Sequence, residues 1–227
     1  ALDEVLRERL TEDGLLYLYE TIEIPLLSIL AQMEQTGITV DGEYLHQLEG
    51  GMKEELARLT EEIYAQAGGP FNINSPKQLG VVLFEDLGLP VIKKTKTGPS
   101  TNAEVLETLA EQHLIASYLL EYRQLSKLFS TYVHALPTLI NSQTGRIHTT
   151  FHQKVTATGR LSSAEPNLQN IPIRTEVGRQ IRKAFIPGDP DWFLLTADYS
   201  QIELRILAHM SGDENMVEAF CCGQDIH

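Results

Sequence analysis

The chain of 227 residues has few of the features that mark secreted, membrane-bound or disulfide-rich proteins. Its two cysteines, Cys221 and Cys222, are adjacent, a spacing that suits neither a zinc knuckle nor a disulfide framework, so we expect reduced thiols in a cytosolic protein. No apolar run is long enough to span a bilayer, and no signal-peptide pattern opens the chain. What remains is a globular protein, long enough for one large or two modest domains.

Basic residues are also scarce, with 18 lysines and arginines against 31 acids, and the net charge of −13 argues at first against a nucleic-acid partner. The distribution of charge reverses that argument. Residues 1–62 hold fifteen acids and four bases, whereas residues 143–183 hold seven bases and two acids. Lys93, Lys94 and Lys96 form a second basic spot. An acidic body with localised basic surfaces suits a protein that binds a polyanion, although charge alone also fits an ordinary mixed surface.

Hydrophobic periodicity and capping residues predict helices over most of residues 1–140. The clearest is a long amphipathic helix that begins after Asp41 and ends at Gly68, with a local bend expected at the glycine pair 50–51. Capping boxes at Ser75 and Thr101 open two more helices. The remaining expected helices cover residues 2–20, 25–35 and 114–135, the last ending before Pro137, and residues 88–100 are expected to form a mobile basic loop.

The pattern changes near Asn141, where mixed α/β character begins. Residues 146–156 are rich in β-branched and aromatic types and predict strands, and residues 157–175 lack periodicity. A long structureless stretch within a compact region is more often functional than idle. Further along, the sequence predicts a short helix at 176–183, a buried strand at 192–198, and helices at 200–210 and 214–221.

The end of the expected strand at 192–198 places Asp198 where the chain turns into a helix. A carboxylate in that position can hold a metal rigidly, but from composition alone it is more often a cap for the following helix. The longer string Asp198-Tyr199-Ser200-Gln201-Ile202-Glu203-Leu204-Arg205 decides between these interpretations. It resembles the first catalytic motif of family A DNA polymerases, the bacterial DNA polymerase I family.

That resemblance gives six residues of the motif a role. It implies that Asp198 is catalytic and binds two Mg²⁺ ions, and that the backbone carbonyl of Tyr199 helps to hold one of them. It implies that Glu203 lies under the incoming sugar and excludes a 2′-hydroxyl by collision. The nucleotide site would also include Ser200, Gln201 and Ile202. Without the resemblance, Glu203 would be an ordinary exposed helix residue.

A second string, from Thr156 to Pro172, is a polar loop whose side chains can meet minor-groove acceptors, which are nearly the same for every base pair. From composition it could equally be a polar surface loop. Its extended resemblance to family A polymerases implies that Arg160 contacts the primer-terminal pair and that Asn167 and Gln169 contact the duplex nearby. Thr156 and Asn170 are predicted to contact DNA as well, and Arg174 is predicted to orient the incoming nucleotide.

Weaker signals agree with this assignment. His227 matches a family histidine that contacts the triphosphate. Arg123 and Lys127 share one helix face and match positions that touch the DNA backbone, although both could be solvated charges. The loop that carries Lys93, Lys94 and Lys96 corresponds to the tip of the family's thumb, where it would grip phosphates.

The resemblance implies an α+β fold, in which a helical thumb is followed by a partial antiparallel-sheet palm with flanking helices. Residues 1–40 would form a helical junction that leads from an absent upstream exonuclease domain into the palm. Residues 41–140 would form the thumb, and residues 141–227 the N-terminal part of the palm. Both ends look cut from a longer protein, and the fragment alone is expected to be inactive.

The expected function is template-directed addition of deoxynucleotides to a primer 3′-hydroxyl by two-metal phosphoryl transfer, in DNA replication and repair. The partners would be primer–template DNA and deoxynucleoside triphosphates, with no membrane, in a monomeric parent enzyme of the bacterial cytoplasm. The alternatives are a non-catalytic duplex-binding module and a single-subunit RNA polymerase, against which Glu203 argues. A nuclease would need a second carboxylate cluster, which the sequence does not show.

Overall fold

The computed structural model describes residues 2–96 and 98–226, and the chain forms two compact units, Ala1–Gly188 and Asp189–His227. Small antiparallel sheets occur beside many helices, which confirms the α+β prediction. No helix in these two described stretches is long and apolar enough to cross a membrane.

The first unit begins with helices α1 (Leu2–Glu12), α2 (Leu16–Leu18), the π-helix η1 (Tyr19–Glu23) and α3 (Ile24–Thr36). The prediction of one unbroken helix over residues 2–20 is wrong, because Gly14 adopts a left-handed conformation with φ of 70° and ends the first helix. From Leu16 onward the helix continues to Thr36, so Pro25 lies near the start of α3 but not at the start of the helical stretch. Gly37 ends it as predicted, with φ of 61°.

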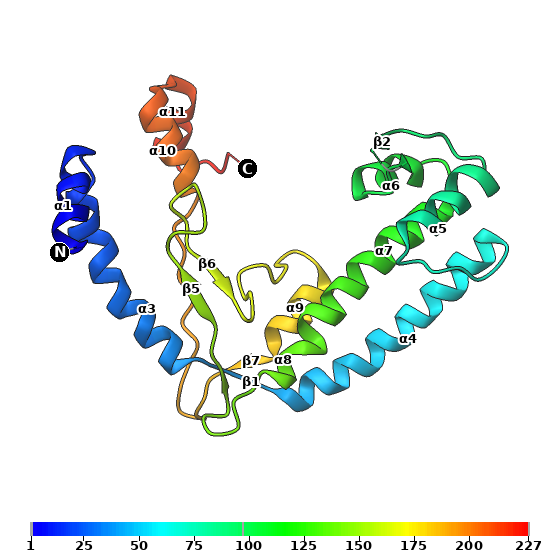
Figure 1. Ribbon diagram of the computed structural model, residues 1–227, viewed down its shortest axis with the longest axis horizontal. Coiled ribbons are helices and arrows are strands. Elements are labelled where there is room, and N and C mark those ends of the chain that lie inside the picture. Colours follow the sequence, from blue (N-terminus) through cyan, green and yellow to red (C-terminus); the bar gives the residue numbers. More distant parts are fainter. Residues whose placement is uncertain (1, 97, 227) are drawn as a thin grey trace. The chain divides into compact units, whose positions relative to one another are not determined.

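Two long helices, α4 (Gly42–Ala67) and α7 (Leu114–Leu128), run side by side (Figure 1). The predicted cap of α4 is confirmed, because Asp41 Oδ1 accepts a hydrogen bond from the Tyr44 amide at 2.9 Å. Gly68 ends the helix in a left-handed conformation, with φ of 79°. The glycine pair at 50–51 lies inside α4 and does not interrupt it.

Shorter helices surround this pair: α5 (Pro76–Val81), η2 (Val82–Asp86), α6 (Ala103–Ala110), η3 (Phe129–Val133) and α8 (Ala135–Thr138). Ser75 caps α5 as predicted, but the cap of α6 is Asn102 and not Thr101, because Asn102 Oδ1 accepts from the Val105 amide at 3.1 Å. The predicted stop before Pro137 is also wrong. Pro137 lies in the first turn of α8, where the missing N–H costs no helical hydrogen bond.

Two buried apolar clusters hold the helices together. One, with Leu59 and Leu136 fully buried, joins α4 and α7 to η3, α8 and the strands near their base. The other, with Leu83 and Leu106 fully buried, joins the far ends of α4 and α7 to α5, η2 and α6. Each fully buried leucine contributes about 1.5–3 kcal/mol relative to an exposed one, so the two clusters fix both ends of the helical pair.

A charged contact reinforces the first cluster. The carboxylate of Glu49, on α4, accepts hydrogen bonds from Lys53 Nζ at 2.9 Å and from His134 Nδ1 at 3.1 Å. The bond from Lys53, together with that from His134, lowers the pKa of Glu49 to about 2. The carboxylate therefore stays charged at neutral pH and ties α4 to the junction between η3 and α8.

The predicted basic loop at 88–100 contains a small hairpin, formed by β2 (Lys94–Thr95) and β3 (Gly98–Pro99). Lys93 Nζ forms an exposed ion pair with Glu104 Oε2 at 2.9 Å, and the Ser100 amide donates to the Lys93 carbonyl at 2.8 Å. The segment is therefore partly ordered by hydrogen bonds to itself and by the ion pair to α6.

The central sheet of the first unit has the order β4–β1–β7, and all its pairings are antiparallel. Strand β1 (Ile38–Val40) lies between β4 (Arg146–Ile147) and β7 (Phe185–Ile186), with Ile38 opposite Ile147 and Thr39 opposite Ile186. A separate pair joins β5 (Thr150–His152) to β6 (Ser162–Ala164). The predicted strands at 146–156 are thus confirmed, whereas β6 lies in a stretch that was expected to be structureless.

Helix α9 (Glu176–Lys183) matches its predicted bounds, and Thr175 Oγ1 caps it by accepting from the Gly178 amide at 3.1 Å. Helix α3 is joined to β5, because Glu34 Oε1 accepts from the Phe151 amide at 2.6 Å. The bond from Phe151 to Glu34 links α3 to β5, and β5 pairs with β6 of the polar loop.

The second unit contains α10 (Ile202–Ser211) and α11 (Glu214–Cys221). The predicted strand at 192–198 is wrong, because this segment pairs with no strand in the described part of the chain. Phe193 and Leu195 are 91% and 93% exposed, so the expected burial is wrong as well. A continuous apolar run does not make a strand by itself, since a strand needs a hydrogen-bonded neighbour. The helix predicted over 200–210 begins two residues late, at Ile202.

Candidate functional site

A hollow of about 380 Å³ lies at the turn that enters α10. It is lined by Asp198, Tyr199, Gln201, Ile202, Glu203 and Leu204. The structure therefore brings the predicted metal-binding carboxylate and the predicted sugar-excluding carboxylate to one surface. Asp198 is exposed, and Ser200 lies in the same turn.

The shape of this turn depends on Gln201 and Arg205. Gln201 has φ of 52° and ψ of 35°, a left-handed conformation that side chains other than glycine rarely adopt. Arg205 Nε donates to the carbonyl of Ser200 at 2.9 Å, and its guanidinium carbon lies 4.6 Å from the centre of the Phe220 ring. Arg205 thus ties the turn to α11, a role that the sequence pattern did not reveal.

The donors at the turn suit a hard divalent cation. The Asp198 carboxylate and the Tyr199 carbonyl are oxygen ligands, and Mg²⁺ commonly takes only one or two carboxylates while keeping waters and phosphate oxygens. Across residues 2–96 and 98–226, no group of three or more His, Cys, Asp or Glu side chains could hold a metal. The residues present therefore fit part of a magnesium site, with Asp198 as the carboxylate.

The polar loop, Thr156 to Pro172, is folded on itself by hydrogen bonds. Thr156 Oγ1 donates to the carbonyl of Arg160, and Gln169 Nε2 donates to the carbonyl of Leu161 at 3.3 Å. Asn167 Oδ1 accepts from the Gln169 amide at 3.0 Å. The loop thus brings together four of the predicted DNA contacts, and the side chains of Arg160 and Asn170 are exposed.

Two buried hydroxyls support this loop, that of Ser163 from within it and that of Thr149 from the residue before β5. Ser163 Oγ accepts from the Leu168 amide at 3.2 Å and donates to Asn167 Oδ1 at 3.4 Å. Thr149 Oγ1 donates to the carbonyls of Ala164 and Pro166, at 3.1 and 2.7 Å. Sequence reasoning missed both residues, because a small hydroxyl side chain carries no signal until its partners are known.

Three arginines of the basic segment 143–183 donate hydrogen bonds to backbone carbonyls. Arg182 NH2 donates to the Ile171 carbonyl at 2.9 Å, and Arg146 NH1 donates to the Thr36 carbonyl at 3.2 Å. Arg179 pairs with Glu176 and donates to the carbonyl of Arg174 at 2.9 Å. Arg174 itself is exposed immediately before α9, where its side chain can reach a ligand.

The predicted phosphate contacts on the helical region differ in their surroundings. Lys127 is exposed, whereas Arg123 is half-buried and its guanidinium donates to the carbonyl and, at 3.4 Å, to the hydroxyl of Thr101. Burial lowers the pKa of Arg123. Arg123 is therefore not a simple solvated charge, and it anchors the segment that follows the hairpin of β2 and β3. Lys94 and Lys96 are exposed beside Lys93 in that hairpin.

One predicted residue, His227, lies outside the described residues. The turn at Asp198 belongs to the unit Asp189–His227, and the polar loop belongs to the unit Ala1–Gly188.

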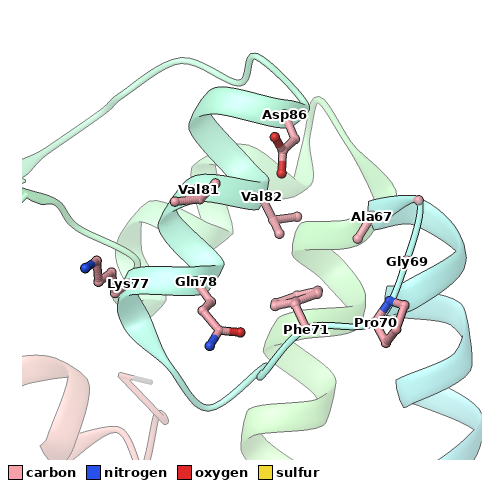
Figure 2. Close-up of a pocket in the computed structure, with 10 residues that line it drawn as sticks. Ala67, Gly69, Pro70, Phe71, Lys77, Gln78, Val81, Val82 and Asp86 are labelled. Carbon is pink, nitrogen blue, oxygen red and sulfur yellow. The ribbon is translucent and has the colours of Figure 1, made fainter.

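A larger hollow, of about 540 Å³, lies where the segment after α4 meets α5 and η2 (Figure 2). The segment after α4 contributes Gly69, Pro70 and Phe71 to its lining. Helix α5 contributes Lys77, Gln78 and Val81, and η2 contributes Val82 and Asp86. None of the residues predicted to bind nucleotide, metal or DNA lies in it. It has one carboxylate and no second acid, so it does not suit the same chemistry as the turn at Asp198.

Comparison with known proteins agrees with the motifs. The model of DNA polymerase family A matches residues 42–227. DNA polymerase I of Bacillus subtilis (strain 168) is 54% identical over 227 residues, which are 100% of this chain and 26% of that protein. The thermostable DNA polymerase I of Thermus aquaticus is 56% identical over 218 residues, which are 95% of this chain and 26% of that protein.

A solved structure also matches, described as the POL domain of Pol1 from M. smegmatis in complex with DNA primer-template and dNTP. The TM-score is 0.93 with 47% sequence identity, over 99% of this chain and 40% of that one. The chain thus spans about a quarter of the length of the relatives named above. Since the family match covers most of the sequence and includes both motifs, the chain belongs to DNA polymerase family A.

Proposed function

We propose that this chain is part of a template-directed DNA polymerase, which adds deoxynucleotides to the 3′-hydroxyl of a primer in DNA replication and repair. The observation that carries the proposal is the hollow shared by Asp198 and Glu203, in a chain of family A. Residues 41–140 would serve as the thumb, residues 141–227 as the first part of the palm, and residues 1–40 as the junction that leads into the palm. The pairing of β1 with β4 and β7 supports this last assignment.

In the proposed reaction, the primer 3′-oxygen attacks the α-phosphate of the nucleotide and pyrophosphate leaves. Family A polymerases depend on metal ions, and we propose two Mg²⁺ ions, which when bound neutralise the charge on the phosphates and on the reacting oxygens. Asp198 and the Tyr199 carbonyl would hold them at the entrance to α10. The exposed position of both residues supports this assignment, because phosphate oxygens and waters must complete the coordination.

Glu203 would select the sugar. Its place in the same hollow as Asp198 supports a side chain lying beneath the incoming nucleotide, where a 2′-oxygen would collide with it. Ile202 and the backbone of Ser200 and Gln201 would form the neighbouring surface. Arg174 and His227 are proposed to orient the triphosphate.

The polar loop would hold the primer–template end. Arg160, Asn167, Gln169 and Asn170 would meet minor-groove acceptors, which suits an enzyme that must bind correctly paired DNA of any sequence. Thr156 contributes by bonding to the carbonyl of Arg160 within the same loop. The exposed lysines at 93, 94 and 96 would add phosphate contacts.

The DNA contacts of the helical region can be separated by the salt dependence of binding. In the full-length polymerase we expect Lys127→Ala to reduce the slope of log affinity against log salt by about one, because one phosphate contact is lost. We expect Arg123→Ala to weaken binding without changing the slope, because its guanidinium is bonded to Thr101. Fluorescence anisotropy with duplex DNA between about 50 and 200 mM salt measures both slopes. An equal loss of slope in both variants would show that Arg123 also contacts a phosphate.

The proposed function is tested by primer extension with a defined template. We expect the full-length polymerase to extend the primer with deoxynucleotides and the isolated 227-residue chain to leave it unextended. The physical reason is that the proposed two-metal site needs more than the single carboxylate of Asp198, and no group of three or more His, Cys, Asp or Glu side chains in residues 2–96 and 98–226 could hold a metal. Extension by the isolated chain would contradict the partial site, and failure of the full-length protein would contradict the polymerase assignment.

The non-catalytic alternative makes a different prediction in the same assay. A duplex-binding module would bind primer–template DNA in both forms and extend it in neither. We further propose that the full-length enzyme is a monomer in the bacterial cytoplasm, bound to primer–template DNA and deoxynucleoside triphosphates.

A further inference from the structure

The side chain of Gln201 bonds to the last two described residues, Asp225 and Ile226. Its Nε2 donates to Asp225 Oδ1 at 2.7 Å, and its Oε1 accepts from the amide of Ile226 at 3.3 Å. Both polar atoms of one carboxamide therefore bind neighbouring residues of the same segment. Both bonds are exposed to solvent, and the one to the Asp225 carboxylate is charge-assisted. We call this two-point contact the clamp, because one side chain binds two successive residues.

The position of Gln201 in the chain gives the clamp its importance. Gln201 lies between Asp198 and Glu203, and its backbone has the left-handed conformation that turns the extended segment into α10. A glutamine has no intrinsic preference for that conformation, so surrounding contacts must hold it. The clamp on one side and the bond from Arg205 to the Ser200 carbonyl on the other provide those contacts.

The same geometry argues against direct binding of the nucleotide by this side chain. A triphosphate would need the Nε2 group as donor, but Nε2 faces the Asp225 carboxylate at 2.7 Å. A second anion brought to that position would be repelled by the first. The family resemblance places Gln201 at the nucleotide site. We therefore expect its backbone, and not its carboxamide, to contact the nucleotide.

We propose that Gln201 is a positioning residue, whose carboxamide clamps the Asp225–Ile226 segment and thereby holds the turn that sets Asp198 against Glu203. This inference rests on the proposed function for its effect on catalysis. The clamp itself has a separate signature, because protection of the Ile226 amide from hydrogen exchange depends on Gln201 and not on turnover.

The test uses variants of the full-length polymerase in which the amide at position 201 and the carboxylate at position 225 are replaced singly or exchanged. Gln201→Glu places a carboxylate against Asp225 and removes the donor, so the clamp should break. Asp225→Asn alone should be near neutral, because its side-chain oxygen still accepts from Gln201. The double variant Gln201→Glu/Asp225→Asn should restore both bonds with one reversed, since the introduced asparagine amide can donate to the new carboxylate, and it keeps the net charge of the unaltered protein. Gln201→Gly removes the clamp but allows the left-handed backbone.

We expect Gln201→Glu to lower kcat by about 10- to 100-fold, with little change in the KM for deoxynucleotide, because the reacting groups are misplaced and not unbound. Discrimination against ribonucleotides should fall with it, and the Ile226 amide should lose protection. The double variant should recover all three properties, and Gln201→Gly should behave like Gln201→Glu. A raised KM without rescue would overturn the proposal in favour of direct nucleotide binding, and unchanged protection of Ile226 would overturn the clamp.

Protection of the Ile226 amide tests the clamp, and primer extension tests the proposed polymerase function. Loss of Ile226 protection in Gln201→Glu and its recovery in the double variant would support the clamp even in a protein that extends no primer. Primer extension by the unaltered polymerase, measured alongside, decides the proposed function by itself.

Discussion

Replacing Asp198 by alanine in the full-length polymerase is expected to abolish measurable primer extension while DNA binding is retained. A carboxylate that holds a catalytic metal supports several kcal/mol of charge stabilisation in the transition state, and each step of about 1.4 kcal/mol corresponds to a factor of ten in rate. Removal of Asp198 should therefore lower kcat by about 10³-fold or more. DNA affinity should change little, because the proposed duplex contacts lie on the polar loop and the helical region.

Single-turnover extension and anisotropy with the same primer–template measure the two quantities. Asp191→Ala provides a matched control, because Asp191 is an exposed acid of the same unit that has no proposed role. Near-normal turnover in Asp198→Ala would exclude this residue as a metal ligand. Equal loss of activity in the control would point to a folding effect and would also contradict the specific role of Asp198.

Replacing Glu203 by alanine is expected to admit ribonucleotides. If Glu203 occupies the place of a 2′-oxygen, its truncation removes the collision, and the preference for deoxyribose should fall by roughly 10- to 200-fold, the usual range for a contact of one small group. Turnover with deoxynucleotides should fall much less. Competing incorporation of a deoxynucleotide and its ribonucleotide counterpart, expressed as a ratio of kcat/KM, measures the effect.

Glu214→Ala is the matched control for this variant, since Glu214 is an exposed acid at the start of α11 in the same unit. Its sugar preference should be that of the unaltered enzyme. If Glu203→Ala kept full discrimination between deoxyribose and ribose, the proposed steric role of Glu203 would be wrong.

The sequence predicted best those elements whose signals are local. The caps at Asp41 and Ser75 and the bounds of α9 and α11 follow from side chains within a few residues of each helix end. Strand β1 was not predicted, because three residues carry too little alternation and its partners lie more than a hundred residues away. The strand expected at 192–198 failed for the related reason that apolar residues cannot supply their own pairing partner.

The residues of the candidate site also divide into those with a signal in the sequence and those that need a distant partner. The predicted roles of Asp198, Glu203, Arg160 and Asn167 rest on two long strings, in which the order of residues along the chain is itself the signal. The supports of those residues were not identified. The hydroxyls of Thr149 and Ser163 bond to the loop, and their roles needed the three-dimensional partners. Gln201 was assigned to the nucleotide site from the sequence, but its bond to a residue 24 positions away was not predicted.

The order of the central sheet has a consequence for how the helical region is attached. The chain leaves the sheet at Val40 and returns at Arg146, and β1 and β4 are neighbouring strands, so the two ends of this long excursion lie close together. Residues 41–145 are therefore an insertion between adjacent strands, joined to the sheet at two points that lie close together. An insertion of this kind can change in length without altering strand register, because the free-energy cost of a longer excursion between fixed ends grows only slowly. The β4–β1–β7 pairing can thus be kept while the length of the helical insertion varies.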